Sequence, residues 1–209
     1  MNRIFVSGGA GFIGSHICDR LLGLGHEVVC FDNLVTGSEK NISHLIEIEG
    51  FTFYKGDLRN EDDIQSAITG CTHVCHQAAL GSVPRSIENP VLTNDMNIVG
   101  SLNLLFLAVK NSVSRFVFAS SSSVYGDSLE MPKKEEDTGN PLSPYAVTKS
   151  ALEQYSKVFN EIYDIDTVGL RYFNVFGPRQ SPEGAYAAVI PIFLKSLIKG
   201  ESPVIFGDG

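Results

Sequence analysis

The stretch Ser7 to His16, S-G-G-A-G-F-I-G-S-H, decides the fold of this chain. It follows a short apolar run, Ile4 to Val6, which predicts a buried strand, and it leads into the helix-length segment Ile13 to Leu24. Glycines between a strand and a helix let the backbone come close to a pyrophosphate group at the helix N-terminus. The stretch therefore predicts a strand, a tight turn and a helix that together bind the diphosphate of a dinucleotide.

Asp32 ends the next predicted strand, 32 − 14 = 18 residues after Gly14, where the ribose hydroxyls of a dinucleotide need an acceptor. The glycines fit the pattern whether it is counted from Gly8 or from Gly9. The carboxylate of Asp32 would repel a 2′-phosphate, and the segment 33–39 contains no Arg to hold one. These residues favour NAD over NADP.

Short apolar runs alternate with helix-length segments along most of the chain. Repeated alternation of strand and helix predicts an α/β fold, a Rossmann-like doubly wound parallel sheet with helices on both faces. Ligands bind beyond the carboxyl ends of the strands in such sheets. The predicted strands are Ile4–Val6, Val28–Phe31, Phe51–Tyr54, Val74–His76, Phe116–Ala119 and Thr167–Leu170, and the predicted helices are Ile13–Leu24, Glu61–Ile68, Val91–Val109 and Tyr145–Ile162.

The composition favours a small-molecule partner. The formal charge of 16 − 24 = −8 and the lack of a basic stripe argue against nucleic acid and anionic membranes. No apolar run approaches the roughly 20 residues of a membrane span, and no cleavable leader is recognised, so we expect a cytoplasmic protein that does not span a membrane.

The four cysteines lie in strand-like and helix-like segments, which is typical of buried thiols in a reducing compartment. One cluster, C-T-H-V-C-H from Cys71 to His76, could place Cys71, His73 and Cys75 on one face of a strand as metal ligands. Its apolar context and the lack of a second ligand cluster favour a buried strand, so we expect no metal.

The serine run Ser120 to Ser123 follows an apolar strand and contains no Asp or Glu, so it lies where a parallel sheet places its active site. Tyr145 and Lys149 are spaced i, i+4 and share one helix face. Ser143 and Pro144 resemble an N-cap and a first position, which puts Tyr145 in the first turn. A nearby ammonium and the positive helix end both lower the pKa of a tyrosine, so Tyr145 is a candidate base.

Four motifs together carry a family resemblance. In order they are S-G-G-A-G-F-I-G-S-H, S-S-S-S-V-Y-G-D, S-P-Y-A-V-T-K and L-R-Y-F-N-V-F-G-P-R. They are similar to those of the extended short-chain dehydrogenase/reductases, specifically the nucleotide-sugar epimerases. Two further stretches, His76 to Ser86 and Arg179 to Pro191, resemble the UDP-N-acetylglucosamine 4-epimerases. The resemblance implies NAD as cofactor, a UDP-sugar substrate and a homodimer formed through the helices Val91–Val109 and Tyr145–Ile162.

The resemblance also implies roles for single residues. In this family Ser121 would bind the 4-oxygen of the sugar, Tyr145 would be the base, and Lys149 would assist it. The expected cofactor-binding residues are Gly8, Gly11, Phe12, Ile13, Gly14, Asp32, Asn33, Asp57, Leu58, Gln77, Ala78, Ala79, Tyr145, Lys149 and Tyr172. The expected substrate-binding residues are Gly81, Ser82, Ser121, Ser122, Ser123, Tyr145, Asn174, Ala188 and Val189.

The lack of an acid in the serine run limits the reaction. The resemblance implies that relatives which eliminate water or decarboxylate carry Asp or Glu there, and a serine hydroxyl cannot replace one near neutrality. We therefore expect 4-epimerisation of a UDP-hexose, UDP-N-acetylglucosamine or its galacto epimer, through a transient 4-keto sugar. The alternatives are 4-epimerisation of UDP-glucose or of a UDP-uronic acid, and a dinucleotide-binding protein without turnover.

The final segment predicts part of a second domain. We expect an NAD-binding domain over residues 1–176 and the start of a substrate-binding subdomain over residues 177–209, with a helix at Ala185–Lys199 and a strand at Val204–Phe206. Because members of the family continue past G-D-G, this C-terminal subdomain is expected to be incomplete. Such a chain would bind NAD and turn over a UDP-sugar poorly.

Overall fold

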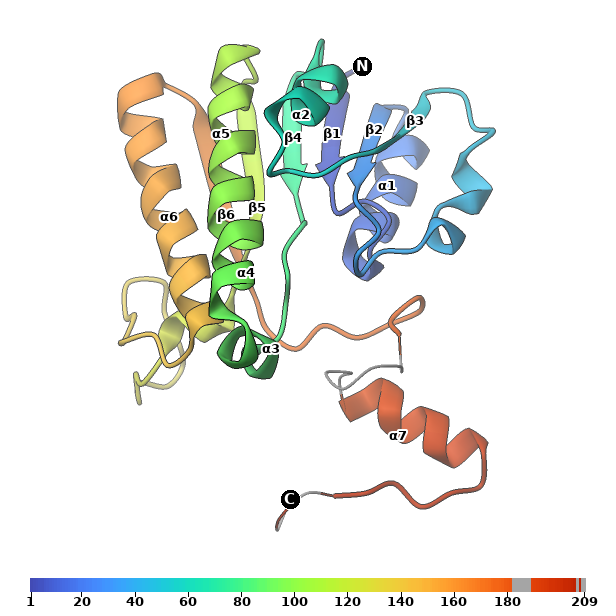
Figure 1. Cartoon of the computed structure of the whole chain (residues 1–209), viewed down its shortest axis with the longest axis vertical. Coiled ribbons are helices and arrows are strands. Elements are labelled where there is room, and N and C mark those ends of the chain that lie inside the picture. Colours follow the sequence, from blue (N-terminus) through green and yellow to red (C-terminus); the bar gives the residue numbers. More distant parts are fainter. Residues whose placement is uncertain (182–188, 206, 208–209) are drawn as a thin grey trace. The chain divides into compact units, whose positions relative to one another are not determined.

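The computed structural model describes residues 1–181, 189–205 and 207 of the chain. It divides into two compact units, Met1–Phe173 and Asn174–Gly209, and the expected domain boundary at residue 176 stays a prediction. The first unit is a parallel sheet with helices packed on it (Figure 1). The predicted Rossmann-like α/β fold is confirmed.

Six parallel strands form the sheet in the order β3-β2-β1-β4-β5-β6. The order reverses between β1 and β4, and ligands bind at such a reversal, beyond the carboxyl ends of the strands. Ser7 at the end of β1 lies opposite His76 at the end of β4. The strands are β1 (Arg3–Ser7), β2 (Glu27–Asp32), β3 (Phe51–Lys55), β4 (His73–His76), β5 (Arg115–Ser121) and β6 (Asp166–Tyr172).

The helices agree with the predicted segments except between β4 and β5. There the expected helix Val91–Val109 is divided into three parts by a π-helical turn, and a short helix that was not predicted precedes it. The helices are α1 (Phe12–Gly23), α2 (Glu61–Ile68), α3 (Val83–Glu88), α4 (Pro90–Asn94), the π turn Asp95–Val99, α5 (Gly100–Lys110), α6 (Pro144–Tyr163) and α7 (Val189–Ile198).

Two hydrophobic cores lie on the two faces of the sheet. The first joins side chains of α2, α5 and α6, such as Ile64, Leu104 and Leu152, to the strands. The second lies under α1 and the turns at Glu39–Leu45. Cys71 belongs to the first core and Cys75 packs against the second, so these two thiols do not share a face as metal ligands would.

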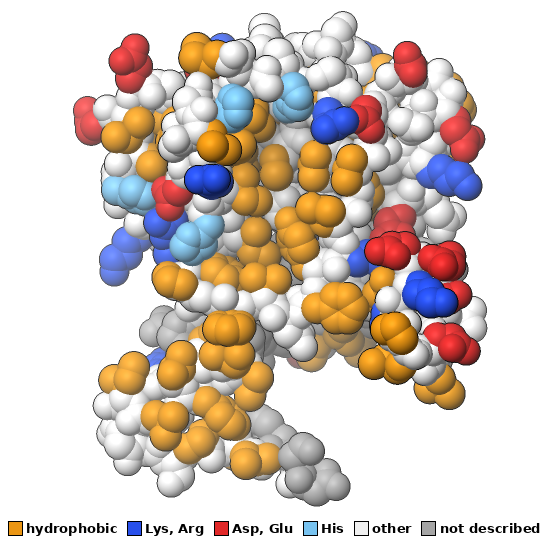
Figure 2. All heavy atoms as spheres, turned by 180° about the vertical axis from the view of Figure 1, so that it is seen from behind, with side chains coloured by type: hydrophobic (Ala, Val, Ile, Leu, Met, Phe, Trp, Pro, Cys, Tyr) orange, Lys and Arg blue, Asp and Glu red, His pale blue; other side chains and the backbone are white. Residues whose placement is uncertain are grey.

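The second core includes no residue of β5 or β6. Val168 and Leu170 of β6 lie on that face, because their neighbours Thr167 and Arg171 bond to α6, and they are 37% and 43% exposed. Figure 2 shows the molecule from this side, with hydrophobic side chains gathered over the middle of the face. This half of the sheet is thus covered on one face only in the described part of the first unit.

By length and composition alone the helical run Pro90–Lys110 could cross a membrane, so the expectation that no segment has these properties was wrong. Its apolar character has a structural explanation, because Leu104, Leu105 and Ala108 are buried in the first core. A core helix that packs on a sheet can be as long and as apolar as a membrane-spanning helix.

The second unit contains α7, which has no buried residue. The predicted helix began at Ala185, and residues 185–188 lie outside the described part of the chain. The expected strand Val204–Phe206 is not formed at Val204 and Ile205, and residue 206 is not described.

Candidate active site

The glycine turn brings three backbone segments into contact. Gly8 has a φ of +67°, and its N–H donates to Phe31 O at 2.8 Å. A Cβ atom on Gly8 would lie 2.6 Å from Ala78 N, and one on Gly14 would lie 2.1 Å from Gly8 O. Side chains at these two positions would therefore force the turn, the end of β4 and the start of α1 apart.

Asp32 closes the turn from the side of β2. Its carboxylate accepts hydrogen bonds from Ala10 N at 3.0 Å and from Leu34 N at 2.8 Å. Burial raises the pKa of Asp32, and these two bonds act in the opposite direction. A Cβ on Gly37 would lie 2.8 Å from the carboxylate, so the segment after β2 also needs a glycine.

A cavity of about 230 Å³ lies at the carboxyl ends of β1 to β4. Twelve of the fifteen residues expected to bind the cofactor line it: Gly8, Gly11, Phe12, Ile13, Gly14, Asp32, Asn33, Asp57, Leu58, Gln77, Ala78 and Ala79. Gln77 Oε1 is buried and has no hydrogen-bond partner among the described residues. An unpaired buried acceptor in the lining fits a cavity that receives a polar ligand.

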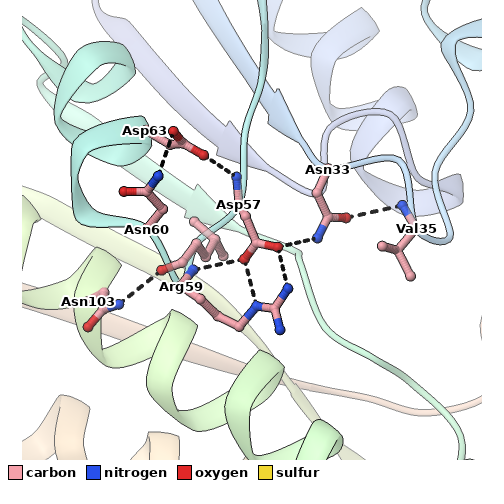
Figure 3. A network of polar contacts seen from close by, with 8 residues as sticks. Asn33, Val35, Asp57, Arg59, Asn60, Asp63 and Asn103 are labelled. Carbon is pink, nitrogen blue, oxygen red and sulfur yellow. Dashed lines mark hydrogen bonds and ion pairs between the residues drawn. The ribbon is translucent and has the colours of Figure 1, made fainter.

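Asp57 is the centre of a polar network beside this cavity (Figure 3). Arg59 donates two side-chain hydrogen bonds to it at 3.0 and 2.7 Å, and Asn33 Nδ2 donates a third at 3.2 Å. Asp63 accepts from the Asp57 backbone at 2.9 Å. The Arg59 guanidinium is the main cause that lowers the pKa of Asp57 to about 2, so this side chain is an anionic acceptor in a fixed orientation.

Ser121, Tyr145 and Lys149 are brought together at the end of β5. The predicted cap is confirmed, because Ser143 Oγ accepts from Ala146 N at 3.1 Å and Pro144 opens α6. The Tyr145 side chain hydrogen-bonds with Ser121. Lys149 Nζ donates to Ala119 O at 2.8 Å and lies 5.9 Å from the centre of the Tyr145 ring.

The expected lowering of the Tyr145 pKa is not found in this structure. Burial raises the pKa, and the hydrogen bond with Ser121 lowers it by less. Burial also lowers the pKa of Lys149 to about 8. The ammonium of Lys149 bonds to a backbone carbonyl and lies beside the ring of Tyr145, so in this arrangement it does not outweigh desolvation of the phenol.

The other serines of the run form a short 3₁₀ turn, Ser122–Tyr125, which Ser121 caps. Ser123 Oγ is buried without a hydrogen-bond partner in the described part of the chain. Ser120 instead points to α6 and hydrogen-bonds with Glu153, which also accepts two bonds of 2.9 Å from Arg171 of β6. This ion pair fixes the end of β5 between α6 and β6.

The remaining substrate-binding candidates lie in three places. Gly81 and Ser82 follow β4, and Ser82 has a φ of +108° and caps α3. Asn174 and Val189 belong to the second unit and are exposed. Ala188 lies outside the described residues.

Tyr172, an expected cofactor-binding residue that does not line the cavity, ends β6. Burial raises the pKa of Tyr172, and a side-chain hydrogen bond with Gln77 acts in the opposite direction.

Residues 4–209 match the model of the NAD dependent epimerase/dehydratase family. The chain belongs to this family. The family is NAD-dependent, in agreement with the NAD prediction, and the glycine turn, Asp32 and the cavity fit that cofactor.

Several members of the epimerase/dehydratase family are similar over nearly the whole chain. The UDP-N-acetylglucosamine 4-epimerase of Methanobrevibacter ruminantium M1, solved with UDP-N-acetylmuramic acid, is 45% identical with a TM-score of 0.95, over 100% of this chain and 66% of that one. The UDP-glucose 4-epimerase of Thermotoga maritima, solved with UDP-glucose, is 37% identical with a TM-score of 0.93, over 99% of this chain and 66% of that one.

A UDP-glucose 4-epimerase of Mycolicibacterium smegmatis is 39% identical over 214 residues, which cover 99% of this chain and 66% of that protein. The chain therefore spans 66% of the length of each of these relatives.

Several residues that line the cavity were not among the predicted ones. Met96 and Leu80 line the cavity, and so do Thr36 and Gly56. Thr36 lies in the segment 33–39 after the second predicted strand, and Gly56 lies two residues after the third, so both could have been included by position. Met96 could not, because it reaches the cavity from the π turn, which no sequence pattern indicated.

Proposed function

We propose that this protein is an NAD-dependent 4-epimerase of UDP-sugars. The observation that carries the proposal is the meeting of Ser121, Tyr145 and Lys149 beside the cavity-lining end of β4, with no carboxylate in the turn Ser122–Tyr125. Similarity to UDP-sugar 4-epimerases supports the same reaction.

The cofactor end of the site is built by three groups. The backbone around Gly8 and Gly14 would accommodate the diphosphate, Asp32 would accept from a ribose, and Asp57 would accept from the adenine amino group. The chemistry that NAD supplies when bound is reversible hydride transfer at C4 of the sugar.

The proton is moved by Tyr145. Its ionised phenolate oxygen takes the proton of the sugar 4-hydroxyl, and the phenol so formed later returns it, while Ser121 holds the 4-oxygen by a hydrogen bond. Lys149 stabilises the ionised phenol. The 4-keto sugar turns over in the site before it is reduced on its opposite face, so the product differs from the substrate only at C4. Elimination of water or of carbon dioxide would need a further acid or base, and the serine run offers none.

The preferred substrate is UDP-N-acetylglucosamine or its galacto epimer. The M. ruminantium enzyme supports this choice, and the T. maritima and M. smegmatis enzymes support UDP-glucose as the second candidate. Ser82, Ser123 and Asn174 are the residues that we assign to sugar nucleotide contacts. Ala188 and Val189 are assigned to the uridine side.

We also propose that the protein forms a homodimer through the helical run Pro90–Lys110 and α6, which lie side by side in Figure 1. Both carry exposed hydrophobic side chains: Val91, Val99 and Phe106 on the first, and Val147, Val158 and Ile162 on the second. Val158→Asp would then shift the sedimentation of the protein from dimer to monomer, and an unchanged dimer would contradict the assignment.

The test of the function is an assay of the complete protein with UDP-N-acetylglucosamine, UDP-glucose and UDP-glucuronic acid in parallel, each followed by NMR. We expect the C4 epimer of the first in the greatest yield and no deuterium at C4 when the reaction runs in D₂O, because the hydrogen removed is the one returned. Release of a 4-keto sugar, of a decarboxylated sugar or of no product would contradict the proposal.

A further inference from the structure

A buried chain of hydrogen bonds connects the cofactor end of the site to the helix that carries the base. It begins at Ser7, the last residue of β1, whose Oγ lies 2.6 Å from Nδ1 of His76. His76 Nε2 lies 2.8 Å from Oγ of Ser101 on α5. All three side chains are at most 1% exposed. His76 is thus a buried titratable group to which the proposed reaction assigns no role.

Asn97 of the π turn continues the chain to α6. Ser101 Oγ donates to Asn97 O at 2.5 Å. The side chain of Asn97 accepts from Leu80 N at 2.7 Å and donates to Leu80 O and to Thr148 Oγ1, both at 3.2 Å. The Thr148 hydroxyl donates to Tyr145 O at 2.8 Å. The chain therefore ends in the first turn of α6.

Counting protons fixes the direction of the bonds at His76. Ser101 has one hydroxyl proton and gives it to Asn97 O, so its oxygen can only accept from the imidazole. Nε2 of His76 must then carry the ring proton, and Nδ1 accepts from the hydroxyl of Ser7. Burial, with the charge of Lys149 as a smaller cause, lowers the pKa of His76 to about 3, so the ring stays neutral.

We propose that His76, with its proton on Nε2, is a positioning residue that holds the cofactor turn and the helix of Tyr145 and Lys149 at a fixed separation. This role rests on the proposed function. The same chain fixes the cavity-lining segment 77–80 at both ends, because Ala78 N donates to Ser7 Oγ at 3.4 Å and Asn97 holds both backbone groups of Leu80. The imidazole offers one nitrogen at the δ position to Ser7 and one at the ε position to Ser101 within a rigid ring, whereas both polar atoms of an Asn side chain lie at the δ position.

The first test is the tautomer of His76, read from the imidazole nitrogens by ¹⁵N NMR of the complete protein. We expect the neutral Nε2–H form from about pH 5 to about pH 9. In Ser101→Ala the acceptor of Nε2–H is lost while the Ser7 hydroxyl can turn and accept, so the proton is expected to move to Nδ1. Ser7→Ala is expected to keep Nε2–H. A wild-type ring with Nδ1–H, a ring that titrates in this range, or a Ser101→Ala variant that keeps Nε2–H would overturn the assignment.

The second test separates positioning from stability. In His76→Asn we expect kcat to fall about tenfold while KM for the UDP-sugar changes less than about twofold, because misplaced reacting groups slow chemistry more than binding. His73→Asn is the matched control, since this histidine lies on the same strand and its ring bonds to Thr72. If His76→Asn does not fold, Ser101→Ala takes its place as the test variant. This smaller change removes the acceptor of His76 Nε2–H and is expected to reduce kcat in the same way.

A His76→Asn or Ser101→Ala variant with reduced melting temperature and unchanged kcat would overturn the positioning role. If the wild-type protein does not epimerise any UDP-sugar, the proposed function fails, and the tautomer measurement still decides whether the hydrogen-bond chain exists as described.

Discussion

The cofactor end and the sugar end of the candidate site differ in which parts of the chain build them. At the cofactor end, twelve predicted residues line one cavity, and all of them belong to Met1–Phe173. At the sugar end, Ser121, Tyr145 and Lys149 meet in the same unit, but Asn174 and Val189 belong to a second unit whose helix α7 has no buried residue. The expected cofactor residues that line the cavity thus all belong to one folded unit, whereas two of the expected sugar nucleotide contacts, Asn174 and Val189, belong to another. Variants at each end are therefore expected to have separable effects.

Tyr145→Phe is expected to have the largest effect, and at the sugar end only. Loss of the phenol removes the proposed base, so epimerisation is expected to fall by about 10³-fold or more, while the affinity for NAD changes less than about twofold. Turnover and calorimetric NAD binding are measured on the complete protein. Tyr155→Phe, on an exposed part of the same helix, is the control. Turnover retained in Tyr145→Phe would remove this residue from the mechanism.

Asp32→Ala addresses the cofactor end. The variant loses the proposed ribose acceptor, the charge that repels a 2′-phosphate, and the bonds to Ala10 and Leu34. We expect NAD affinity to fall about 10- to 100-fold and the preference over NADP to shrink. Titration of both cofactors measures it, with Asp62→Ala on the exposed side of α2 as a control of equal charge change. Unchanged NAD affinity would mean that Asp32 does not contact the ribose.

Lys149→Met separates stability from function at a residue that lies between the cofactor end and the sugar end of the candidate site. Because burial lowers the pKa of Lys149 from 10.5 to about 8, the charged amine destabilises the folded state below about pH 8. The variant also loses a bond to Ala119 O, so a net gain of about 1–2 kcal/mol in unfolding free energy is expected at pH 7.

The pH dependence gives the sign of this effect. The wild type is expected to gain stability as pH rises from about 8 towards 10.5, as Lys149 loses its proton, so the advantage of Lys149→Met shrinks over that range. Denaturant unfolding at pH 7 and at pH 9.5 measures both values. An advantage that grows with pH would contradict the assignment of a destabilising buried charge.

Arg59→Ala is expected to have the smallest effect. The pair with Asp57 is partly exposed, so its loss is expected to cost about 0.5 kcal/mol or less. Since Arg59 lowers the pKa of Asp57 from 3.8 to about 2, this contribution is present above about pH 4 and is lost as pH falls towards 2. Unfolding at pH 7 and pH 3 checks it, with Arg59→Lys beside it. A cost of several kcal/mol would show that the network of Figure 3 is more buried in solution.

The features that local chemistry determines could be predicted from the sequence. Gly8 and Gly14 are required where the backbone makes contacts that a Cβ would block, and the N-cap of α6 follows from Ser143 and Pro144. The alternation of predicted strands and helices along the chain was sufficient to predict the parallel sheet. The i, i+4 spacing correctly predicted that Tyr145 and Lys149 share one face of α6, the face that meets the end of β5.

The features that depend on long-range contacts could not be predicted. The ion pair of Glu153 and Arg171 joins α6 to β6, and nothing in either segment shows that the two side chains meet. The raised pKa of Tyr145 depends on burial of its ring, which spacing does not reveal. The roles of Asn174 and Val189 stay predictions, because they belong to the second unit.

The π turn Asp95–Val99 has a consequence for how this family can vary in length. A π turn contains one residue more than an α-helical turn. The residues that follow it are therefore rotated about the helix axis by about 100° relative to an uninterrupted α-helix. In this arrangement Met96 reaches the cavity, Asn97 reaches α6, and Gly100 packs where a Cβ would lie 3.0 Å from Leu58 Cβ. A deletion or insertion of a single residue between Asn94 and Met96 would rotate Met96, Asn97 and Gly100 away from these contacts at once. Homologous sequences are therefore expected to align here without gaps, and length variation is expected in the exposed segment before α6 instead.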